Sequence, residues 1–239
     1  YGRSADVLGA ALARRPATDA ARTVLIKTFL NQAGLMKHLG RSKDEIAAWS
    51  RALEQQKQRA ADFPDQPDPL ADVARSLFAL AELHADNALQ RQAGLSAAYD
   101  RQKAALKLAP GRTDLLTNLG VYGVALVEFF AHRNDYAKAA AESRRVSADM
   151  PPNWPGLVAL AEHLAQAAAA ARGDSRLKPA DRDAAIRACG DTAIALLRRA
   201  IEGGFQDAAR LQTANEFREL RDAPEFREEF AKLIASIPN

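Results

Sequence analysis

DYAKAAAESRRVSADMPP (residues 135–152) contains the pattern that organises the chain. Its small and apolar residues recur at helical spacing, and two prolines, which cannot continue a helix, close it. Similar helical stretches end at Pro16, Pro64, Pro110 and Pro151, which are 48, 46 and 41 residues apart. An Asp, Thr or Asn able to cap a new helix follows each of these prolines within a few residues. The spacing therefore predicts an internal repeat.

Each repeat interval divides again into two helical segments. Breaks are expected at Gly40, near Gly94, at Asn134 and across RGDSRLKPADRD (172–183). Alanine and leucine, which lead the helix scale, must supply most of the packing, because only 6% of the residues are aromatic. No segment shows a sustained alternation of period two, so we expect helical hairpins and no strands.

Composition and charge exclude several classes of protein. The net charge is +3, and the basic residues occur in pairs with acids nearby rather than in a stripe, so we expect no nucleic-acid partner. The single cysteine, Cys189, cannot form an internal disulfide and is expected to be a small buried residue. No continuous apolar run approaches the roughly 20 residues that span a bilayer, so we expect no membrane contact in this segment and a cytoplasmic location.

Catalytic motifs are not found in the sequence. HRN (132–134) and APE (223–225) match fragments of protein-kinase motifs, but the essential catalytic Asp is replaced by Asn, and the proline instead opens a helix. The four histidines never form an i, i+4 pair, which argues against a metal site. We therefore expect a chain that is not an enzyme and that carries no metal and no cofactor.

The repeat resembles the tetratricopeptide (TPR) family. Tyr136, Ala139, Val146 and Pro151 stand where the second half of a TPR has its aromatic residue, its two small or apolar packing positions and its closing proline. A second copy of the pattern has Ala98, Ala105 and Pro110, and Asn118-Leu119-Gly120 resembles the first-helix signature. The intervals exceed the usual 34 residues of a TPR. The resemblance implies an all-α, right-handed TPR-like α-solenoid of about four irregular helical hairpins, closed by a C-terminal helical cap.

The predicted boundaries treat residues 1–239 as a single superhelical domain. Its expected parts are the second helix of a preceding unit (1–16), four hairpin units (17–66, 67–110, 111–152 and 153–204) and the C-terminal cap (205–239).

The last 60 or so residues carry a more specific resemblance. LKPADRDAAIRACGDTAIALLRRAIEGGFQDAARLQTANEFRELRDAPEFREEFAKLI (177–234) is similar to the end of TPR regions that follow the catalytic domain in large bacterial eukaryote-like Ser/Thr protein kinases. That similarity implies a fragment of a larger protein whose kinase domain lies outside this chain. Within the stretch, Gly203-Gly204 follows a helix, with no strand before it and no lysine after it. It is therefore interpreted as a helix stop and not as a phosphate-binding loop.

Binding remains as the expected function. First helices of successive units line a concave groove in TPR arrays, so polar residues on those helices are the candidate contacts to a protein or peptide, supplied by another chain or by the same polypeptide. Lys27 and Asn31 lie four residues apart and share a helix face. Alternatives are a homo-oligomerisation platform and, less favoured, a helical enzyme. The candidate groove residues are Lys27, Asn31, Lys37, Asn87, Asn118, Tyr122 and Glu128.

Overall fold

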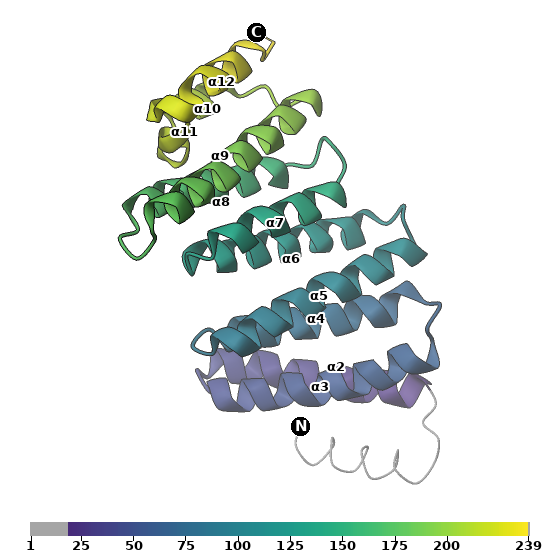
Figure 1. The fold of residues 1–239 in the computed structure, drawn as a ribbon. Coiled ribbons are helices and arrows are strands. Elements are labelled where there is room, and N and C mark those ends of the chain that lie inside the picture. The colour runs from purple at the N-terminus through teal and green to yellow at the C-terminus, as the bar shows by residue number, and fades with distance from the viewer. Residues whose placement is uncertain (1–18, 239) are drawn as a thin grey trace. The chain divides into compact units, whose positions relative to one another are not determined.

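The computed structural model describes residues 19–238, so the helix predicted over 1–16 lies outside the described residues. Within the described range the chain forms α-helices, one short 3₁₀ helix and no strand, which confirms the all-α prediction (Figure 1). The elements are α2 (Asp19–His38), α3 (Ser42–Asp62), α4 (Pro67–Leu83), α5 (Ala88–Leu108), α6 (Thr113–His132), α7 (Tyr136–Ala148), α8 (Gly156–Gly173), α9 (Pro179–Glu202), α10 (Ala208–Thr213), η1 (Asn215–Phe217), α11 (Arg218–Asp222) and α12 (Pro224–Ala235).

The chain divides into two compact units, Tyr1–Tyr122 and Gly123–Asn239. In the first unit, α2 packs against α3, α3 against α4, and α4 against α5 (Figure 1). Small residues let these helices approach closely. Gly94, for example, lies within α5, where an added Cβ would stand 2.8 Å from the Cβ of Ala81 on α4. The break expected near Gly94 is therefore wrong: the turn lies between α4 and α5, and Gly94 serves helix packing instead.

Two glutamines occupy the same position in α3 and α5, and both are fully buried. Gln56 accepts a hydrogen bond of 2.6 Å from the Ser76 hydroxyl of α4, and Gln102 donates one of 2.8 Å to the Leu115 carbonyl of α6. Each glutamine therefore bonds the first helix of the following hairpin. Because a buried polar group costs free energy unless it is paired, these contacts favour one orientation of α3 on α4 and of α5 on the first turn of α6.

Three turns use a residue with positive φ to end a helix. Gly40 has φ 66°, Asn134 has φ 60° and Gly204 has φ 102°. At Gly204 the amide of Phe205 donates to the Ala200 carbonyl (2.9 Å) and the amide of Gly204 to the Ile201 carbonyl (2.9 Å), the pair of bonds that defines a Schellman motif. The predicted breaks at Gly40 and Asn134 are confirmed, and Gly203-Gly204 is confirmed as a helix stop.

The second unit is built on the α8–α9 hairpin. α7 packs against both α8 and α9. The guanidinium of Arg199 on α9 donates to the carbonyls of Ser147 and Met150 at the end of α7. The backbone of Gly203 lies directly against the Pro152 carbonyl, at a place where a Cβ would collide with it. The C-terminal end of α9 is therefore joined to the turn between α7 and α8.

The C-terminal elements cover this hairpin. α12 packs against α9, while η1 and α11 pack against α8 (Figure 1). Phe226 is buried with its ring against Gly190 of α9, and the rings of Phe217 and Phe230 lie 6.1 Å apart. These three buried rings are part of the apolar contribution of residues 205–238 to the unit.

Among the described helices, α6 is the one candidate for a membrane span. It is 20 residues long and apolar enough, by length and composition, to cross a bilayer. More than half of that stretch is buried within the chain. A buried core helix meets the same criterion, so α6 on its own is weak evidence for a membrane span. It does, however, reach the length of about 20 residues that we expected no apolar segment to approach.

Candidate functional site

The exposed face of α2 carries three of the candidate groove residues. Lys27 and Asn31 are exposed on one face, and Lys37 is exposed in the last turn. Apolar side chains lie on the same face: Val24 is 51% exposed and Leu35 is 43% exposed. This helix face therefore combines exposed apolar side chains with a lysine and an amide that can form hydrogen bonds.

Two further candidates lie on the part of α6 that belongs to the first unit, and they differ in exposure. Asn118 is exposed, next to Val121 on the same helix. Tyr122 is buried and stacks on Phe78 of α4, with ring centroids 4.6 Å apart. Burial raises the pKa of the Tyr122 hydroxyl. Tyr122 is therefore a packing residue in this structure, which counts against its prediction as a ligand contact.

Asn87 and Glu128 have local partners. Asn87 lies beyond the end of α4 and caps α5, where its side chain accepts a 3.1 Å hydrogen bond from the Gln90 amide. It is thus not on a first helix, which corrects its placement in the groove. Glu128 is half-buried in the second unit, with its Oε1 3.8 Å from Nδ1 of His132.

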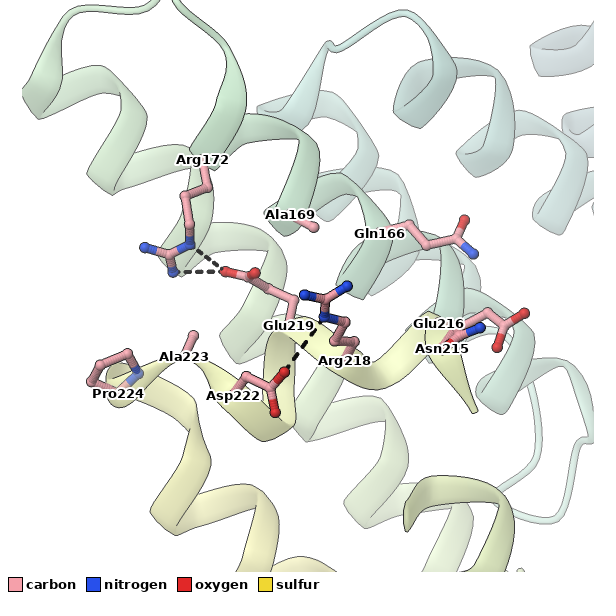
Figure 2. Close-up of a pocket in the computed structure, with 10 residues that line it drawn as sticks. All are labelled: Gln166, Ala169, Arg172, Asn215, Glu216, Arg218, Glu219, Asp222, Ala223 and Pro224. Carbon is pink, nitrogen blue, oxygen red and sulfur yellow. Dashed lines mark hydrogen bonds and ion pairs between the residues drawn. The ribbon is translucent and has the colours of Figure 1, made fainter. Parts of the chain in front are cut away.

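A pocket of about 480 Å³ lies in the second unit, between the C-terminal part of α8 and the segment from η1 to the start of α12 (Figure 2). Arg172 crosses its edge. Its Nε donates to Glu219 Oε1 at 2.7 Å, and its Nη2 lies 2.5 Å from Glu225 Oε1. Arg218 and Asp222 form a second, longer pair at 3.5 Å. The pocket is lined by Gln166, Ala169, Arg172, Asn215, Glu216, Arg218, Glu219, Asp222, Ala223 and Pro224.

The charges around this pocket largely neutralise one another. The hydrogen bonds that Arg172 donates to Glu219 and Glu225 raise the pKa of Arg172, and the Arg172 guanidinium lowers the pKa of Glu225. A general acid or base that works near neutral pH needs a pKa shifted toward neutrality, and these shifts run the opposite way. The two Arg172 pairs therefore act as a clasp that holds α11 and α12 to α8.

A second polar cluster joins the start of α7 to the loop after α8. The Tyr136 hydroxyl donates to Asp174 at 3.1 Å, and Arg176 lies 2.6 Å from the same carboxylate. The Arg176 guanidinium, followed by the Arg176 amide and the Tyr136 hydroxyl, holds the pKa of Asp174 far below its usual range. Burial and the bond to Asp174 raise the pKa of Tyr136 to about 12.

This cluster predicts how stability depends on acid. Because the folded-state pKa of Asp174 lies below the unfolded value of about 3.9, its contribution is complete above that value and is lost as the pH falls through the folded pKa. Asp174→Asn should therefore lower the urea midpoint of unfolding at pH 7. Between pH 5 and pH 2 the midpoint of this variant should fall less steeply than that of the wild type. Asp183→Asn, on an exposed carboxylate of the same unit, should keep the wild-type decline. An unchanged decline in Asp174→Asn would contradict this role.

Two histidines that are distant in sequence meet in the second unit. The rings of His132 and His163 lie edge to face, with centroids 6.4 Å apart. Burial lowers the pKa of the half-buried His163, an effect that nearby Glu128 opposes and His132 reinforces. Among residues 19–238, no three His, Cys, Asp or Glu side chains are grouped so that they could hold a metal ion.

Cys189 is fully buried on α9, as expected from its neighbours in the sequence. Its Sγ lies 3.6 Å from the Tyr136 carbonyl oxygen, and burial raises the pKa of its thiol to about 12. Since the thiolate is the reactive form of cysteine, this side chain is suited to packing and not to nucleophilic attack.

Comparison with known proteins adds no family assignment. No protein-family model matches the chain, and a search of curated proteins finds no similar sequence.

Sequence reasoning missed the Arg172 clasp and the Tyr136–Asp174 contact. Arg172 is 47 residues from Glu219 and 53 from Glu225, and Tyr136 is 38 residues from Asp174. Contacts over such separations follow no helical spacing. The one local signal is the charge-rich turn after α8, which the sequence marks only as a break between two helical segments.

Proposed function

We propose that the chain is a non-catalytic protein–protein interaction or regulatory module built as a TPR-like stack of helical hairpins. The observation that carries this proposal is the packing order. In each unit a second helix packs against the first helix of the next hairpin: α3 against α4, and α7 against α8. Consecutive packing of this kind is the rule of helical repeat proteins, which bind partners on the surface formed by their first helices.

The exposed face of α2 is the proposed docking surface in the first unit. Val24 and Leu35 supply apolar contact, while Lys27 and Asn31 supply a charge and an amide for hydrogen bonds. Asn118 and Val121 offer a similar pairing on α6. Such a surface suits an extended or helical segment of another protein, or of another part of the same polypeptide. A regulatory role beside a bacterial kinase domain is proposed only on the resemblance of the last 60 or so residues.

The test is a random-peptide display library selected on the immobilised chain, followed by affinity measurements on the enriched peptides. Leu35→Asp and Lys27→Glu should each weaken binding about tenfold or more, because each disrupts the centre of the contact face. Lys43→Glu, an exposed substitution at the start of α3, is the matched control and should bind as wild type does. Peptides that bind all three variants equally would exclude the α2 face, and a library that yields no binder would count against the proposed function.

A further inference from the structure

A second groove lies between α10 and α12 in the second unit, away from the pocket of Figure 2. Its volume is about 570 Å³ and it is open to solvent. Its buried floor is formed by Phe230 and Ile237, with the half-buried Ile234 beside them, and small exposed alanines stand at its rim. It is lined by Ala208, Gln212, Arg221, Arg227, Phe230, Ala231, Ile234, Ala235 and Ile237.

Two arginines give this groove a positive charge, and none of its lining residues within the described range 19–238 is acidic. The Nη1 of Arg221 donates to the carbonyls of Leu211 (3.1 Å) and Ala214 (2.7 Å), which fixes the guanidinium without neutralising it. Its Nε and Nη2 make no hydrogen bond within the described part of the chain. Arg227 is exposed and has no ion-pair partner among residues 19–238.

The nearby carboxylates are already engaged elsewhere. Asp222 pairs with Arg218, Glu228 with Lys232, and Glu229 with Arg198. Both uncompensated arginines lie toward the N-terminal end of α12, whereas Ile234 and Ile237 lie toward its other end. The groove thus offers a positive end and an apolar end.

We propose that the α10–α12 groove binds a peptide segment of a partner protein in which two acidic residues precede a short run of apolar residues. The carboxylates meet Arg221 and Arg227, whose planar guanidinium groups bind carboxylates with two parallel hydrogen bonds. The apolar side chains lie on Phe230, Ile234 and Ile237. Two cations favour a pair of acids over a single carboxylate, and an open groove favours a peptide, because an enclosed pocket is what buries a small ligand.

The test uses the full chain and a defined probe, a fluorescein-labelled Gly-Glu-Glu-Leu-Ala-Leu-Leu amide, followed by fluorescence anisotropy. Wild type should bind it, and the Gly-Gln-Gln-Leu-Ala-Leu-Leu amide should bind at least about tenfold more weakly, since two charge-assisted contacts are lost. Arg227→Gln should weaken binding of the acidic probe about tenfold. Ala231→Trp, which places a large ring over the groove from an exposed position, should abolish it.

Control variants separate this site from the others. Arg187→Gln removes an exposed arginine of the same unit outside the groove and should leave probe binding unchanged. Lys27→Glu on α2 should also leave probe binding unchanged. A failure of the groove proposal can therefore be distinguished from a failure of the proposed function. The proposal is overturned if wild type does not bind the acidic probe, if the glutamine probe binds equally well, or if Ala231→Trp binds as wild type does while circular dichroism shows it folded.

Discussion

Replacing Gly190 with alanine is expected to destabilise the second unit by about 1–3 kcal/mol, although alanine is the better helix former. The ring of Phe226 lies so close to Gly190 that an added Cβ would overlap its edge. Phe226 is itself buried, so the ring cannot turn aside into solvent. The change must therefore push α12 away from α9 or distort α9. Urea unfolding followed by circular dichroism measures the loss.

Two further variants show whether the contact between Gly190 and Phe226 is the cause. Phe226→Ala should cost about 3–5 kcal/mol on its own, because it empties a buried aromatic site. Adding Gly190→Ala to Phe226→Ala should cost less than the single change does in wild type, since the colliding ring is gone. Gly173→Ala, whose new Cβ would meet nothing within 4 Å, is the matched control and should change stability by less than about 1 kcal/mol. Additive costs in the double variant would contradict the contact.

Substitutions at Gly203 and Gly204 are expected to destabilise the same unit for different reasons. Gly203 has an ordinary φ of −81° but is crowded by the Pro152 carbonyl. The added methyl group of Gly203→Ala should therefore overpack this contact and lower the free energy of unfolding by about 1–3 kcal/mol. Gly204 has open space around it but a φ of 102°, so Gly204→Ala costs about 1–2 kcal/mol in backbone strain.

Asparagine separates the two causes, because it tolerates positive φ better than alanine does. Asn134 already ends α6 with a φ of 60° in this chain. Gly204→Asn should therefore recover part of the stability that Gly204→Ala loses, whereas Gly203→Asn should be no better than Gly203→Ala. Thermal unfolding of the four variants provides the comparison. Equal behaviour of asparagine at both positions would refute the distinction.

Features coded by neighbouring residues could be predicted from the sequence. Gly40, Asn134 and the Gly203-Gly204 pair were recognised as helix stops because glycine and asparagine adopt positive φ at little cost. The all-α class followed from residue types that favour helices and from the absence of period-two alternation. In each case the signal and its structural effect lie within one or two turns of the same segment.

Features that depend on distant packing could not be predicted in this way. Gly94 resembles a turn residue in sequence, yet its role comes from Ala81 on the neighbouring helix. Tyr122 is a candidate groove residue by sequence because it is a polar side chain on a predicted first helix, and only the position of Phe78 shows that its ring is buried. The arginines of the α10–α12 groove are conspicuous only once the acids beside them are seen to pair with other residues.

The boundary between the two compact units falls inside α6, because one unit ends at Tyr122 and the other begins at Gly123. A helix is a cooperative element, so fraying that starts on one side of this point removes hydrogen bonds on the other. Both units therefore contribute residues to one helix. For recombinant work, a truncation at this boundary would leave two half-helices, and cuts placed in the turns on either side of α6 would keep the helix whole.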